Sequence, residues 1–221
     1  TAHECGIPTP KTVVSESLDD LYRNGRSVEY PVLLKPAIMH SFYRLCKRKV
    51  IYLERFEDLH KTVEQIIPRI PADQLMLQEI IPGPSSNIFS FGSYYRNPAE
   101  WIAHTNRHTR QIPMDFGTVA TLVESAENSD VAELSLRFLE KIKYRGLSEL
   151  EFKYDERDRK FKLLEMNPRS WKQIALSEIA GLDMPLYAYK DAIGDPVKWK
   201  GNVNSMNACW IDFILRDFRD P

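Results

Sequence analysis

Three polar residues alternate along the segment LLEMNPRSW (163–171): an acid at Glu165, an amide at Asn167 and a guanidinium at Arg169. In an extended strand, alternate side chains point to the same face of the sheet. Carboxylate and amide oxygens are ligands that Mg²⁺ accepts, and the planar fork of arginine matches a phosphate group. The spacing therefore indicates one face of a strand that meets a metal ion and a phosphate.

The residues before this segment predict a partner strand. Two strand-like runs flank the polar turn DERDRK, and the simplest antiparallel pairing is centred near Asp158. About that centre, Glu151 falls opposite Glu165, and Glu149 falls opposite Asn167. Carboxylates directly opposite one another, about 5 Å apart, destabilise a sheet unless something neutralises them. A divalent cation between Glu151 and Glu165 is one interpretation.

The other interpretation of this hairpin is a solvated surface. Nearby lysines could pair with the two acids, namely Lys153, Lys160 and Lys162. The register is decisive, because a slip of one residue turns one acid to the other face. In the expected register the apolar face that packs on a core holds Leu150, Phe152, Leu164 and Met166.

A lysine follows the apolar run YPVLL directly, at Lys35. A cation at the end of a buried strand can meet a phosphate, although lysines also extend from strand ends without any such role. The run LQEIIPG (77–83) predicts a strand that stops at a Pro-Gly break, where unpaired backbone groups could bind the edge of an adenine. Alone, it indicates only a strand end and a turn.

The stretch HTNRHTRQIP (104–113) is rich in cationic and imidazole side chains. His104, Arg107, His108 and Arg110 could hold a carboxylate substrate or a phosphate, or they could form a solvated basic loop. No cysteine or acid lies near enough in sequence to make it a metal site.

The composition limits the class of protein. The chain has 221 residues, a formal net charge of −1 and three scattered cysteines. This balance gives no overall attraction to nucleic acid or to an anionic membrane, and no apolar run approaches the length of a membrane span. We expect no disulfide framework and a reducing, cytoplasmic location.

Periodicity predicts an α+β fold with two lobes, residues 1–82 and 83–221, divided at the Pro-Gly-Pro triplet. The predicted strands are 30–35, 49–54, 75–81, 87–95, 100–105, 118–124, 147–154 and 161–167. The predicted helices are 55–68, 129–144, 171–180 and 185–193, and an amphipathic run follows at 206–218.

Taken in order, five segments resemble the ATP-grasp superfamily: CGIPTPKT, YPVLLKPA, LMLQEIIPG, GLSELEFKYD and KLLEMNPRSW. They extend along the chain to about residue 195. Each motif is weak alone, but their order and the E-x-N-x-R ending are specific together. The resemblance implies two α+β lobes with antiparallel sheets that clasp ATP between them.

The resemblance also implies roles for individual residues. Lys35 and Arg169 are the expected catalytic cations. The expected ATP ligands are Lys35, Lys49, Gln78, Glu79, Ile80 and Ile81, and the expected ligands of Mg²⁺ (or Mn²⁺) are Glu151, Glu165 and Asn167. Glu149 matches no ligand of the family, so we expect it to support the others. The substrate residues are expected at His104, Arg107 and Arg110.

The chain departs from the family pattern in two places. Most relatives carry a glycine-rich flap over the phosphates, whereas the run AIMHSFYRLCKRK (37–49) has no glycine and offers His40, Arg44, Lys47, Arg48 and Lys49 instead. In relatives, a segment like CGIPTPKT follows an amino-terminal domain, so we expect an upstream domain to be missing here.

The expected function is that of an ATP-dependent carboxylate–amine ligase, which forms ADP and a C–N bond through an acyl phosphate. Its partners would be a small carboxylate and a small amine, with no nucleic acid and no membrane. The alternative is an ATP-grasp module that binds nucleotide as a sensor or assembly part without turnover.

Overall fold

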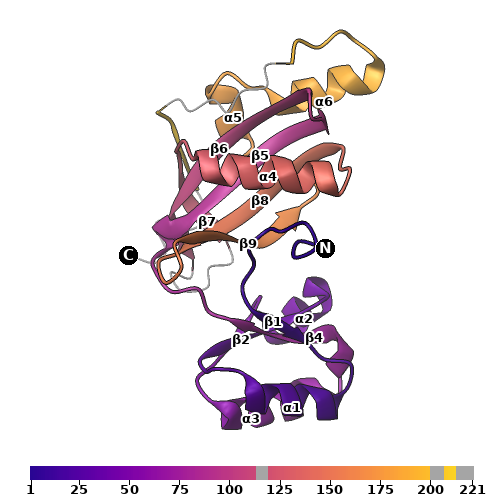
Figure 1. Ribbon diagram of the computed structural model, residues 1–221, viewed down its shortest axis with the longest axis vertical. Helices are drawn as coiled ribbons and strands as arrows, with labels where there is room; N and C mark the ends of the chain where they lie inside the picture. Colours follow the sequence, from indigo (N-terminus) through magenta and orange to yellow (C-terminus); the bar gives the residue numbers. More distant parts are fainter. Residues whose placement is uncertain (113–118, 200–206, 213–221) are drawn as a thin grey trace. The chain divides into compact units, whose positions relative to one another are not determined.

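The computed structural model describes residues 1–112, 119–199 and 207–212, except for the side chains of residues 39–41. It is an α+β protein with two antiparallel sheets, as the sequence predicted. Contacts divide it into two compact units, one of Pro10–Ile81 and one of Thr1–Thr9 with Pro82–Pro221 (Figure 1). The amino-terminal nine residues thus group with the larger unit, whereas the sequence assigned them to the first lobe. The functional domain boundaries stay a prediction.

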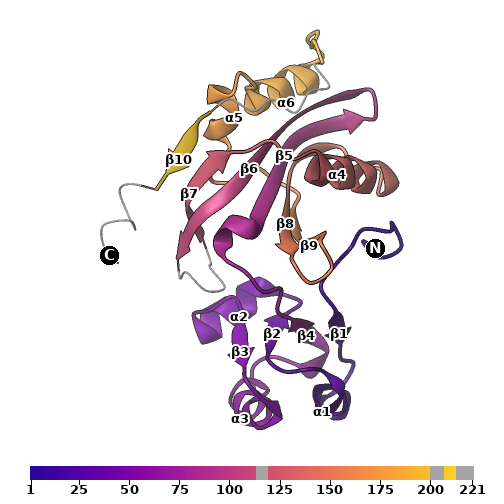
Figure 2. The same cartoon turned by 60° about the vertical axis from the view of Figure 1, so that its left-hand side comes forward.

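The smaller unit is a four-stranded antiparallel sheet in the order β1-β4-β2-β3. Its strands are β1 (Thr12–Val14), β2 (Val32–Pro36), β3 (Ile51–Leu53) and β4 (Leu75–Glu79). Helices α1 (Leu18–Ser27) and α3 (Phe56–Ile66) lie side by side beneath this sheet (Figure 2). The apolar stripe of α3, formed by Leu59, Val63 and Ile66, is buried against α1 and the strands, which explains the helical spacing in the sequence.

The glycine-free run 37–49 forms a helix, α2 (Met39–Cys46), rather than an extended flap. Phe42 is fully buried in the core of the unit, so this helix is anchored by packing. The helix ends at Lys47, which has a left-handed backbone with φ of 55°. The side chain of His40, expected to meet phosphate, lies outside the described part of the chain.

The larger unit is built on a six-stranded antiparallel sheet in the order β10-β7-β6-β5-β8-β9. Its strands are β5 (Ile88–Asn97), β6 (Glu100–Ile112), β7 (Val119–Ser125), β8 (Gly146–Asp155), β9 (Lys160–Asn167) and β10 (Cys209–Ile211). Strand β6 is much longer than the predicted 100–105. Within the amphipathic run 206–218, β10 is the described element, and residues 206 and 213–218 lie outside the described ranges.

Helices cover both faces of this sheet (Figure 2). Helix α4 (Ser129–Lys141) packs on one face, and α5 (Ala175–Ile179) and α6 (Met184–Ile193) lie on the other. Helix α5 occupies only the second half of the predicted 171–180. None of the helices within the described ranges is long and apolar enough to cross a bilayer.

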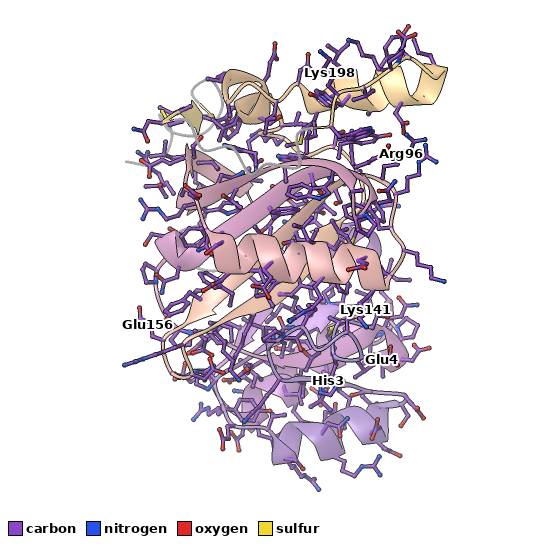
Figure 3. The ribbon with its side chains drawn as sticks, turned by 45° about the horizontal axis from the view of Figure 1, so that its top comes forward. His3, Glu4, Arg96, Lys141, Glu156 and Lys198 are labelled. Carbon is purple, nitrogen blue, oxygen red and sulfur yellow. The ribbon has the colours of Figure 1, made fainter. Side chains whose placement is uncertain are left out.

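Helix α6 is attached to the sheet through Asp191, whose side chain is 7% exposed. Tyr94 donates its hydroxyl to Asp191 at 2.6 Å, and Arg145 donates at 2.8 Å. Arg96, shown beside α6 in Figure 3, lies 3.5 Å from the same carboxylate. These contacts attach α6 to the face of the sheet opposite α4. The same face carries the predicted acids.

Candidate functional site

The predicted pairing of the two acids is confirmed. In the β8–β9 hairpin, Glu151 lies directly opposite Glu165, and Glu149 lies directly opposite Asn167. Directly opposed residues share a face of an antiparallel pair, so all four side chains belong to one face. That face is opposite the one covered by α4, where Leu150 and its neighbours form the main core.

The predicted apolar face needs one correction. A β-bulge follows the Glu151–Glu165 pair, and Phe152 lies opposite Leu163 rather than Leu164. Leu163 is 7% exposed and belongs to the core, whereas Leu164, the extra residue of the bulge, is half-buried. A bulge adds one residue to one strand and so changes which side chains share a face.

Glu149 is the most buried acid of this face, with 3% of its surface exposed. Gln173 donates to its carboxylate at 2.8 Å, and Asn167 lies at 3.4 Å. Burial, and then the neighbouring charge of Glu165, raise the pKa of Glu149 to about 7. Gln173 was missed from the sequence, because it lies in a turn before α5 where no periodic pattern marks its contact with Glu149.

Asn167 connects the acids to the arginine. Its amide nitrogen lies 3.2 Å from Glu165, and its carbonyl oxygen accepts from Arg169 at 3.1 Å. Glu165 and Arg169 are exposed. The described ranges contain no group of three or more His, Cys, Asp or Glu side chains placed to hold a metal. A metal ion at Glu151 and Glu165 would therefore take its remaining ligands from amide, phosphate and water oxygens, which is how Mg²⁺ is commonly bound.

The ring of Trp171 packs against Gly92, and this contact was not predicted from the sequence. A β-carbon added to Gly92 would lie 2.2 Å from Cζ2 of the indole. Gly92 is paired with Glu149 on one side and with His104 on the other. The glycine thus allows the segment after the E-x-N-x-R motif to lie against the acid-bearing face.

The predicted substrate residues do not share one face. His104 is buried on the face that carries the acids, and its Nε2 lies 3.0 Å from Ser125 Oγ. Arg107 alternates to the other face, where it forms an ion pair with Glu124 at 3.2 Å. Arg110 follows a register shift and is exposed. His104, Arg107 and Arg110 therefore do not converge as one anion site, and their role as substrate residues stays a prediction.

In the smaller unit, Lys35 is held at the end of β2 by a hydrogen-bonded chain. Its ammonium donates to Gln78 Oε1 at 3.0 Å, and Gln78 Nε2 donates to Thr12 Oγ1 at 2.9 Å. Lys49 precedes Ile51, which pairs with Leu34, so both lysines lie toward the same end of neighbouring strands. Thr12 was missed because the three-residue β1 is too short for a period-2 pattern.

The predicted adenine segment begins where β4 ends. Glu79 is the last residue of the strand, and its carboxylate accepts from the backbone of Lys11 at 2.8 Å. Ile80 and Ile81 follow it, outside the strand. The nucleotide contacts expected of these three residues stay a prediction.

Comparisons with known proteins identify the fold. The family model described as "Carbamoyl-phosphate synthase L chain, ATP binding domain" matches residues 110–200. A curated relative, the D-aspartate ligase of Enterococcus faecium, is 25% identical over 201 residues, which are 86% of this chain and 47% of the relative. These matches support the resemblance of the sequence to ATP-grasp proteins.

Solved structures agree with this ATP-grasp fold. Biotin carboxylase from Campylobacter jejuni, in a β,γ-ATP complex, matches with a TM-score of 0.75 and 17% identity over 94% of this chain and 47% of that chain. N5-carboxyaminoimidazole ribonucleotide synthetase from Thermus thermophilus matches with a TM-score of 0.70 and 18% identity, over 95% and 54% respectively. The chain spans about half the length of the relatives it matches.

Proposed function

We propose that this chain is the ATP- and Mg²⁺-binding part of a carboxylate–amine ligase that forms ADP. The observation that carries the proposal is the register of the β8–β9 hairpin, which sets Glu151 opposite Glu165 with Asn167 on the same face. Two opposed carboxylates next to an amide are suited to a divalent cation that bridges to phosphate oxygens. A relative named D-aspartate ligase supports ligation as the reaction class.

In the larger unit, charge suggests a role for each of the proposed ligands. Glu151, Glu165 and Asn167 would hold Mg²⁺ (or Mn²⁺), which when bound screens the charge of the phosphates. Arg169 donates from the same face and would offset the charge that develops during phosphoryl transfer. Its present hydrogen bond to Asn167 keeps the guanidinium at that position.

In the smaller unit, the proposed nucleotide ligands are Lys35, Lys49, Gln78, Glu79 and the main chain of Ile80 and Ile81. Lys35 would bind a phosphate oxygen, and Gln78 holds its ammonium group in place at 3.0 Å. Because these polar side chains are already held by hydrogen bonds, they lose less conformational entropy when ATP binds.

The proposed chemistry needs no protein nucleophile. A substrate carboxylate takes the γ-phosphoryl group of ATP and releases ADP; an amine then attacks the acyl carbon, a C–N bond forms and phosphate leaves. The residues of this chain would contribute positioning and charge stabilisation. We place this reaction in the cytoplasm, because ATP is plentiful there and the three cysteines of the chain are free thiols.

Titration calorimetry with ATP and Mg²⁺ tests the assignment. Glu165→Gln and Lys35→Ala should each weaken binding about tenfold or more, since each removes a charged partner of the ligand. Glu156→Gln, in the exposed turn of the same hairpin (Figure 3), and Lys61→Ala, exposed on α3, are matched controls that should bind as the parent does. Parental affinity in both site variants would refute the site.

A second candidate function is nucleotide binding without turnover. Helix α2 favours it, because a packed helix occupies the chain segment where most relatives carry a glycine-rich flap. The two functions differ in one measurement, the release of ADP when carboxylates and amines are supplied together. ATP binding without such release would favour the sensor or assembly function.

A further inference from the structure

A row of polar side chains crosses the large sheet on its acid-bearing face. Strand pairing places Ser125, Asn106, Ser90, Glu151 and Glu165 directly opposite one another, from β7 to β9. Neighbouring strands are about 4.8 Å apart, so Asn106 lies two strands, roughly 10 Å, from Glu151. A small molecule can span that distance.

Asn106 is the one member of this row whose buried oxygen has no partner. It is 1% exposed, and its Oδ1 is buried without a hydrogen bond among the described residues. Buried polar atoms are nearly always hydrogen-bonded, so such an atom calls for an explanation.

The hydroxyl groups on either side of Asn106 are already engaged. His104 lies 3.0 Å from Ser125 Oγ, and His108 lies 2.7 Å from Ser90 Oγ. These two serines are the cross-strand neighbours of Asn106. Each of these serine hydroxyls thus has an imidazole partner, and neither bonds to Asn106 Oδ1.

The charges around Asn106 indicate which kind of group fits there. A carbonyl oxygen accepts a hydrogen bond and so requires an N–H or O–H donor. Burial lowers the pKa of both His104 and His108 to about 4, so both rings are uncharged near neutral pH. The same row ends in two carboxylates. An acceptor among neutral imidazoles and acids suits a primary amine and disfavours an anion.

We propose that Asn106 Oδ1 binds the amino group of the acceptor substrate, an amine of the amino-acid class. This inference rests on the proposed ligase function and names where its second substrate is held. It also changes the expected use of the 104–113 stretch, because the group bound there is a cation or N–H donor rather than a carboxylate.

The chain offers a matched pair of substitutions. Asn106→Leu replaces the amide by an apolar group of similar shape and removes the unpartnered oxygen. Thr105→Val does the same on the opposite face of the strand, where Thr105 Oγ1 is also buried without a partner and lies opposite Phe91 of the core. Both variants should fold with parental or higher stability, since each removes an unsatisfied buried atom.

The test is calorimetric titration of the two variants and the parent with free amino acids, D-aspartate among them, and separately with ATP and Mg²⁺. Succinate, which is aspartate without its amino group, serves as the probe for carboxylate binding alone. We expect Asn106→Leu to bind the amine about tenfold to a hundredfold more weakly and ATP unchanged, and Thr105→Val to match the parent in both.

Three outcomes overturn the proposal. The first is equal amine affinity in Asn106→Leu and the parent, which would leave Asn106 as a site for a buried water. The second is succinate binding as tight as that of D-aspartate, and the third is a parent that binds ATP but none of the amines. Failure of the parent to bind ATP would instead refute the proposed function, and the amine titration would still decide the role of Asn106.

Discussion

Gly92 is the position where the smallest change should disturb the proposed site most. Its backbone is that of an ordinary strand, so alanine adds no backbone strain there. The new β-carbon would lie 2.2, 2.8 and 3.0 Å from three atoms of the Trp171 ring, which is itself 6% exposed and enclosed by a core cluster. A rigid ring that is packed on all sides cannot move without disturbing its neighbours. We expect Gly92→Ala to destabilise the protein by about 1–3 kcal/mol, typical of overpacking.

The displacement should also reach the site, because Trp171 lies two residues from both Arg169 and Gln173. Thermal unfolding should show a decrease of roughly 3–9 °C, and the affinity for ATP with Mg²⁺ should fall about tenfold. Gly194→Ala is the contrasting control: it has open space around it but φ of 78°, so it should destabilise without altering ATP binding.

A double variant, Gly92→Ala with Trp171→Leu, makes room for the methyl group. The two changes should therefore cost less together than the sum of the single variants. Additive costs, or parental stability in Gly92→Ala, would refute the contact between the glycine and the indole.

Three further predictions concern stability and the nucleotide end. Arg157 and Lys162 hold the pKa of the fully buried Asp155 well below its usual value, so this acid should stabilise the fold fully above about pH 4 and lose that effect only as the pH falls through its lowered pKa. Asp155→Asn should therefore cost about 3 kcal/mol in urea unfolding at pH 7 and a smaller but still measurable amount at pH 3. Gln78→Leu removes the acceptor of Lys35, and calorimetry should show about tenfold weaker ATP binding with no change in amine binding. Phe42→Ala should cost about 3–5 kcal/mol in chemical unfolding if α2 is a packed part of the core, whereas a loosely attached flap would lose less than 1 kcal/mol.

Local sequence patterns were sufficient to predict the structure where they had a definite period. The hydrophobic stripe of α3 and the alternation through Glu149, Glu151, Glu165 and Asn167 both follow from geometry within one or two elements. A pattern was also present for β6, but the predicted strand stopped at residue 105. Extending it to 112 places His104 and Arg107 on opposite faces of the strand by alternation.

Other features depend on contacts that have no trace in a local pattern. The partnership of Gly92 with Trp171 joins residues 79 positions apart, and a glycine in a strand does not reveal which side chain lies over it. Gln173 reaches Glu149 from an irregular segment. The unpartnered oxygen of Asn106, and the contacts of its two neighbouring serines with histidines, depend on side-chain positions that only coordinates can show.

The β-bulge in β9 explains how one hairpin supplies both a core and a polar site. Near the turn, Tyr154 pairs with Phe161 and Phe152 pairs with Leu163, a register centred half a residue before Asp158. Continued without interruption, that register would pair Glu151 with Leu164 and turn Glu165 toward the core. The extra residue, Leu164, shifts the strand by one position and places Glu165 opposite Glu151. A hairpin pairing centred at Asp158 therefore predicts the correct partners for the acids and incorrect partners near the turn. One centre of pairing cannot describe a strand whose register changes between the acids and the turn.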